Sequence, residues 1–242
     1  MVQSYVSQYF DTNVYLFISV IIIESILLMI VLYNYNKKKT KYDGTTRRNI
    51  IIWGYFFLII IITSIIILIW KINYNYWDYE IKDIVERISN ILIFLACLIK
   101  VYDVEKVLNE SKNYKGYYFS ILMLIVMIIM VFISPSLLKT FSIIQIILII
   151  FIFAGFSIFP IIYLYLAVKS GGEVRYNSLK VSAGAVFIGL GFLFRYENLI
   201  GYLNINPILD QLIDFLNITS PISIIIGIIL IFWSFLNVLK LK

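Results

Sequence analysis

The chain has 242 residues, of which 62% are hydrophobic and 14% are charged, and its net charge is +6. A soluble domain is about 45–50% apolar and about 25% charged, and a core of this size cannot bury such an excess of apolar residues. The composition therefore excludes a soluble globular protein and predicts an all-α, polytopic membrane protein. The chain has no histidine and one cysteine, Cys97, which excludes histidine-based catalysis and an intrachain disulfide.

Seven apolar stretches meet, or nearly meet, the length of roughly 20 residues that a helix needs to cross a bilayer. In chain order, the predicted spans cover residues 13–35, 49–70, 83–102, 117–134, 142–167, 180–198 and 220–239. Loops and short ends account for the remaining residues. We therefore expect a single transmembrane domain, a seven-helix bundle, over residues 1–242.

Prolines and one polar segment add local detail to this plan. Pro160 lies inside the fifth span and predicts a kink there, whereas Pro221 is expected at a span end. Asn206-Pro207 is a favourable helix start, and the apolar and acidic residues after it fall on opposite faces. We therefore expect a short amphipathic helix over residues 207–217, lying on the outer surface.

The basic residues are distributed unevenly along the chain. Fifteen of the 20 Lys and Arg residues fall in the loops after spans one, three and five or in the C-terminal tail. Because basic loops stay in the cytoplasm, the sequence predicts an extracellular N-terminus, a cytoplasmic C-terminus and a location in the cell membrane. The positive charge is explained by this sidedness, so no nucleic-acid partner is expected.

Polar side chains within the spans are the candidate ligand-binding residues, because charge inside a bilayer is costly. Glu24 lies near the midplane of the first span, and it must face the bundle or carry a proton. The other candidates lie at middle to outer depth: Glu86, Arg87, Asn90, Gln145 and Arg195. Together they predict an outward-facing polar cavity. The competing interpretation is a structural Glu–Arg pair with arginines that reach the outer interface.

Small residues mark the sixth span as a site of close helix packing. Ala185 and Gly189 are spaced by four residues, and Gly184 and Gly191 add bare backbone. Such a pattern permits close approach of another helix, either within the bundle or in an oligomer.

The layout of seven spans, short loops and an extracellular N-terminus resembles rhodopsins and G-protein-coupled receptors. It also resembles the seven-helix sensory regions that precede bacterial and archaeal histidine kinases. The segment KSGGEVRYNSLKVSAGAVFIGLG, residues 169–191, is similar to archaeal seven-helix membrane proteins, and the richness of the chain in Ile, Asn, Lys and Tyr fits a prokaryotic source. The chain departs from rhodopsins because residues 227–234 contain no lysine and the nearest is Lys240, so no retinal cofactor is expected.

Three functions remain open on this basis. The first is a sensor or receptor that binds a small molecule or lipid near Glu24 and signals through a separate protein partner. The second is a small transporter or channel in which Glu24 binds a proton or cation, although inner span halves that are almost wholly apolar argue against it. The third is a structural subunit of a membrane complex. We expect no enzymatic activity, metal or cofactor, because the sequence offers no catalytic constellation.

Overall fold

The computed structural model describes residues 2–38, 44–73, 76–110, 116–132, 157–194 and 208–240. These residues form seven helical segments and no strand, which confirms the predicted all-helical fold. The segments are α1 (Val2–Lys38), α2 (Gly44–Ile72), α3 (Tyr79–Glu110), α4 (Tyr118–Phe132), the segment Ser157–Lys169, α6 (Gly172–Phe194) and α8 (Ile208–Lys240). Each of the seven predicted spans overlaps one of these segments. The gaps at 133–156 and 195–207 hold part of the fifth and sixth predicted spans.

The expected amphipathic helix at 207–217 is not a separate element. The described residues from Ile208 onward form one continuous helix, α8, and Pro221 lies inside it rather than at its end. Packing explains this difference, because Ser220 and Pro221 are buried and the Ser220 hydroxyl donates to the Gly191 carbonyl of α6 at 2.6 Å. A neighbouring helix thus supports the turn at which proline removes a backbone hydrogen bond.

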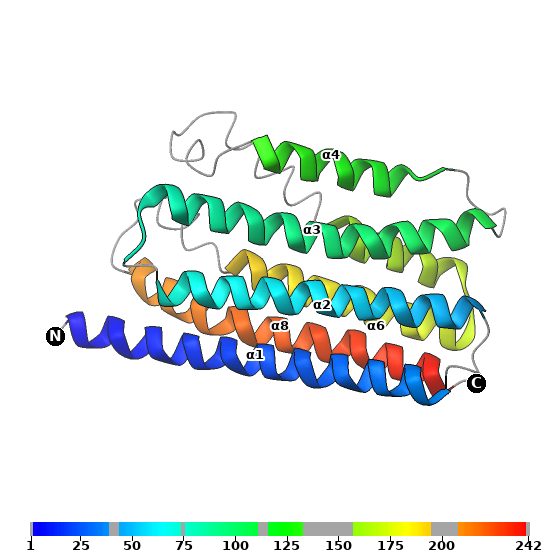
Figure 1. Ribbon diagram of the computed structural model, residues 1–242, viewed down its shortest axis with the longest axis horizontal. Helices are drawn as coiled ribbons and strands as arrows, with labels where there is room; N and C mark the ends of the chain where they lie inside the picture. The colour runs from blue at the N-terminus through cyan, green and yellow to red at the C-terminus, as the bar shows by residue number, and fades with distance from the viewer. Residues whose placement is uncertain are drawn as a thin grey trace.

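The helices form an elongated bundle in which α1 packs against α2 and α8, α3 packs against α2 and α4, and α6 packs against α8. The start of α1 and the end of α8 lie at opposite ends of this bundle (Figure 1). We call the end that contains the α8 terminus the basic end. It holds Lys37, Arg47, Lys106, Lys169 and Arg175, close to the helix termini.

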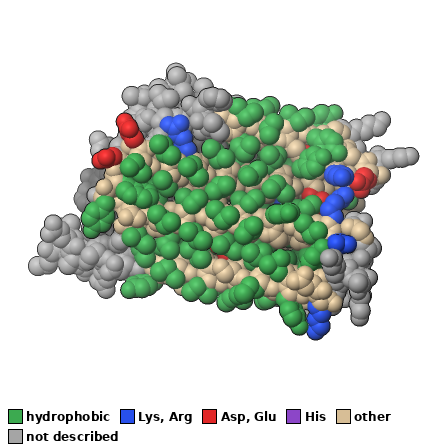
Figure 2. Space-filling view, in the orientation of Figure 1, with side chains coloured by type: hydrophobic (Ala, Val, Ile, Leu, Met, Phe, Trp, Pro, Cys, Tyr) green, Lys and Arg blue, Asp and Glu red, His purple; other side chains and the backbone are tan. Residues whose placement is uncertain are grey.

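The exterior of the described bundle is apolar along its length. Figure 2 shows hydrophobic side chains over the middle of the visible face, with charged side chains toward the two ends. Val14–Lys37, Arg47–Ile72 and Ile218–Asn237 are long and apolar enough to cross a membrane, whereas Tyr118–Ile129 and Ser157–Lys169 are shorter apolar helices. These features are consistent with a membrane protein.

The closest helix contact joins α6 to α8. Asn177, Gly184 and Gly191 recur every seven residues on α6 and face Ser234, Gly227 and Ser220 on the antiparallel α8. The Ser234 hydroxyl donates to the Asn177 carbonyl at 2.9 Å. Gly184 and Gly191 therefore serve packing within the chain, as small residues do in membrane bundles. Oligomerisation through this helix remains a prediction.

Candidate functional site

Glu24 lies on α1 with 0% of its surface exposed. The Ser64 hydroxyl of α2 donates a hydrogen bond to Glu24 Oε1 at 3.2 Å, so the carboxyl group faces the α1–α2 interface. The second oxygen, Oε2, has no hydrogen-bond partner among the described residues. A buried polar atom without a partner is costly, and in a helix long and apolar enough to cross a membrane it marks a candidate functional group.

The other predicted site residues are placed only in part. Asn90 is buried on α3, and Arg87 is partly exposed one turn earlier. The side chain of Glu86 and the whole of Gln145 and Arg195 lie outside the described residues. Within the described part of the chain, Glu24 forms no ion pair. The convergence of all six residues on one polar cavity therefore remains a prediction.

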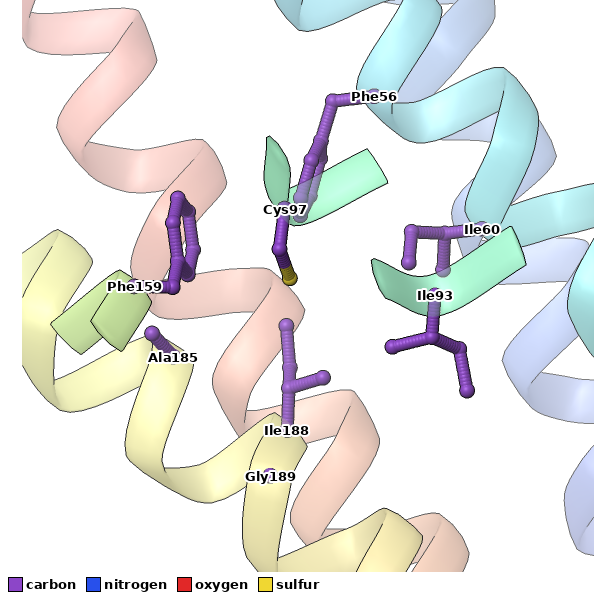
Figure 3. Close-up of a pocket in the computed structure, with 8 residues that line it drawn as sticks. All are labelled: Phe56, Ile60, Ile93, Cys97, Phe159, Ala185, Ile188 and Gly189. Atoms are coloured by element: carbon purple, nitrogen blue, oxygen red, sulfur yellow. The ribbon is translucent and has the colours of Figure 1, made fainter. Parts of the chain in front are cut away.

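A cavity at mid-depth is apolar rather than polar. It is lined by Phe56, Ile60, Ile93, Cys97, Phe159, Ala185, Ile188 and Gly189, and its volume is about 10 Å³. Figure 3 shows the Cys97 sulfur directed into the space bounded by Phe159 and Ile188. A volume of this size is at the lower limit for one water molecule. This cavity is a small packing void and is too small to hold an organic ligand.

A buried polar network near the basic end joins α2 to α3. Lys100 is 1% exposed, and its Nζ donates to Asn49 Oδ1 at 3.1 Å and to Asp103 Oδ2 at 3.5 Å. The same ammonium lies 4.2 Å from the centre of the Trp53 ring. Arg48 Nε lies 3.3 Å from Asp103 Oδ1, so two cations share one buried carboxylate.

Sequence reasoning missed this network. Lys100 is one of the 15 basic residues that were counted above as cytoplasmic, and the inner span halves were expected to be almost wholly apolar. In the structure, Lys100, at the end of the predicted span 83–102, and Asp103, just beyond it, are both buried. A signal was available, because Lys100 directly follows nine apolar residues and Asp103 stands three positions later, a spacing at which helical side chains meet. Arg48 and Asn49 gave no comparable signal, since their contact depends on how α2 packs against α3.

A second buried carboxylate at this end has a structural role. Glu105 of α3 is fully buried, and its oxygens accept the backbone N–H groups of Phe119 at 2.8 Å and Ser120 at 3.0 Å, as well as the Ser120 hydroxyl. The first turn of a helix leaves N–H groups without partners and attracts negative charge. Glu105 therefore caps α4 from the neighbouring helix and holds α4 against α3.

The donor set at these sites does not favour a metal. Among the described residues, no cluster of three or more His, Cys, Asp or Glu side chains could hold a metal ion. Glu24 faces a hydroxyl group, and Asp103 is already occupied by Lys100 and Arg48. The two buried sites thus differ in kind, because Glu24 keeps an oxygen available while Asp103 is matched by cations.

Comparisons with protein-family models, curated proteins and solved structures find no match to this chain.

Proposed function

We propose that this chain is an integral membrane protein that crosses the cell membrane seven times, with its N-terminus outside and its basic end in the cytoplasm. The supporting observation is the apolar exterior. Exposed apolar residues on α2 recur every three or four positions from Ile51 to Ile72, a distance of about 30 Å along a helix. That distance matches the hydrocarbon core of a bilayer. The placement of the start of α1 and the end of α8 at opposite ends of the bundle (Figure 1) supports an odd number of crossings.

Within this membrane protein, we propose a receptor-like function in which Glu24 binds a small molecule or lipid. The observation that carries this proposal is the Glu24 Oε2 atom, which is buried and has no hydrogen-bond partner among the described residues. A ligand with a hydrogen-bond donor would satisfy that oxygen, whereas Ser64 occupies only Oε1. Since Glu24 lies between α1 and α2, binding would change how these helices pack. The change would reach a separate protein partner through the loops at the basic end.

Thermal-shift measurements on the purified protein test this function. The probes are small organic amines, alkali-metal cations and short-chain phospholipids. We expect at least one probe class to raise the melting temperature of the wild type, and we expect the shift to disappear in Glu24→Gln. The amide keeps the shape of the side chain, cannot ionise, and replaces one carboxyl oxygen with an NH2 group. Ser19→Ala, on the exposed side of the same helix, should keep the shift.

Two outcomes would count against the receptor-like function. One is a shift of equal size in Glu24→Gln, since binding would then occur elsewhere. The other is the absence of a shift with every probe class in the wild type. Either result would leave the proposed membrane insertion intact, because insertion is supported by the apolar exterior alone.

A transport function is favoured by one separate observation, the buried charges of Lys100 and Asp103 toward the basic end. With Glu24 they put polar groups in two parts of the bundle. However, Ser64 and Trp53 are about 16 Å apart along α2, and the residues between them include the buried Phe56, Phe57 and Ile60. This apolar layer supports a closed interior. Proton or sodium flux into liposomes that is lost in Glu24→Gln would favour transport over the receptor-like function.

A further inference from the structure

Lys180 of α6 lies between two aromatic rings that come from different helices. Its Nζ is 4.2 Å from the centre of the Tyr176 ring of α6 and 4.5 Å from the centre of the Trp233 ring of α8. Tyr176 is 62% exposed and Trp233 is 56% exposed. The structure therefore presents a cation between two aromatic faces on the outside of the bundle, an arrangement that attracts the ammonium electrostatically.

The ammonium of Lys180 forms no ion pair with any residue that the structure describes. Glu173 is the acidic residue in the first turn of α6, but it lies seven positions before Lys180, which is about 10 Å along a helix. Aromatic rings stabilise a cation but accept no strong hydrogen bond from it. The ammonium of Lys180 thus keeps N–H groups that can donate hydrogen bonds to an external anion.

The two rings belong to a rigid pair of helices. The Ser234 hydroxyl, next to Trp233, donates to the carbonyl of Asn177, next to Tyr176. Two turns earlier on α8, Gly227 lies against the backbone of Gly184. These contacts hold the α6 and α8 backbones in register, so that the backbone positions that carry the two rings are set before any ligand arrives.

The surroundings of Lys180 point to a lipid rather than to a soluble anion. Leu179 and Ile229, which lie nearby on the same two helices, are exposed apolar residues. Lys180 follows the start of α6 by eight residues, or about 12 Å, which is the region where a lysine in a membrane helix extends toward the headgroups. Tyrosine and tryptophan prefer the same level of the bilayer.

We propose that Lys180, Tyr176 and Trp233 form a binding site for the phosphate headgroup of an anionic phospholipid in the leaflet at the basic end. The ammonium binds the phosphate, and the two rings pack against the glycerol and the upper acyl chains. An anionic lipid fits better than a zwitterionic one, because the choline group of the latter would add a second cation beside Lys180. This inference rests on the proposed membrane insertion, and the site is distinct from Glu24.

Native mass spectrometry of the protein released from lipid nanodiscs tests the site. The nanodiscs contain phosphatidylglycerol and phosphatidylcholine in equal amounts. We expect the wild type to retain phosphatidylglycerol in preference to phosphatidylcholine. In Lys180→Gln the ratio of the two retained lipids should fall about fivefold, in line with the effect of one lysine at an anionic surface. The matched control is Lys169→Gln, which removes the same charge from an exposed lysine that lies over a single ring, Tyr165, at 5.8 Å.

Several results would overturn the proposal. One is equal phosphatidylglycerol retention in Lys180→Gln and in the wild type. Another is a loss of retention in Lys169→Gln as large as that in Lys180→Gln, which would indicate a general charge effect. Displacement of the lipid by inorganic phosphate would indicate a site for the free anion instead. Tyr176→Leu provides a second variant should Lys180→Gln fail to fold, and it should also lower the retention. A chain that does not enter nanodiscs at all would contradict the proposed membrane insertion, whereas insertion with unchanged retention contradicts this site alone.

Discussion

Replacing Asp103 by alanine should lower the free energy of unfolding by about 3–5 kcal/mol, the usual cost of removing one partner from a buried ion pair. Asp103 accepts from Lys100 at 3.5 Å and pairs with Arg48 at 3.3 Å. Without it, the ammonium of Lys100, which is 1% exposed, keeps Asn49 and the Trp53 ring as its partners among the described residues. The melting temperature of the purified protein in detergent, monitored by size-exclusion chromatography after heating, reports this loss of stability.

Two further variants separate the buried charge from general disruption of the helix. Lys100→Met combined with Asp103→Ala should recover much of the lost stability, because neither buried charge remains. Arg48→Ala should cost less than Asp103→Ala, since the Arg48 side chain is 32% exposed and is not needed to neutralise Lys100. A double variant that is less stable than Asp103→Ala would contradict the importance of charge compensation at Lys100.

The second large effect is expected at Gly227, where even a methyl group has no room. A Cβ atom there would lie 2.5 Å from the Gly184 carbonyl oxygen and 2.6 Å from Ile188 Cγ1. Because the nearest atom belongs to backbone, α6 and α8 would have to move apart. We expect Gly227→Ala to destabilise the protein by about 1–3 kcal/mol, as overpacking of a well-packed core does. The melting temperature in detergent reports this change.

Gly189→Ala is the matched control for this effect. Gly189 lies on α6 as Gly184 does, but a Cβ atom there meets nothing within 4 Å, and the residue borders the small apolar cavity. The melting temperature of Gly189→Ala should equal or exceed that of the wild type, because alanine is also a better helix former than glycine. If Gly227→Ala melts at the same temperature as Gly189→Ala, the result would contradict the close packing of α6 and α8 at Gly227.

The helical segments were predictable because long apolar stretches and polar breaks carry strong local signals. The error at residues 207–217 has a physical cause. Asn206-Pro207 and Pro221 are local signals for a helix start and a helix end, but the contact of Ser220 with Gly191 continues α8 through Pro221. Such a contact joins residues far apart in the sequence, and a reading of local patterns cannot include it.

The candidate sites likewise combine residues with a strong local signal in the sequence and partners that only packing brings together. Glu24 was predictable, since a lone carboxylate in an apolar span is conspicuous in any sequence. Its partner Ser64 was not, because a serine in a membrane helix is common and 40 positions separate the two residues. The Lys180 site depends even more on packing, as Trp233 comes from α8 and reaches the lysine only through the α6–α8 register.

The proposed topology is tested most directly by labelling the two ends of the chain in intact cells. The only native cysteine, Cys97, is buried, so single cysteines can be introduced as Gln3→Cys and Lys242→Cys and treated with a membrane-impermeant maleimide. Gln3→Cys should be labelled in intact cells, and Lys242→Cys only after permeabilisation. Labelling of both ends in intact cells, or of neither until permeabilisation, would place the termini in one compartment and contradict seven crossings.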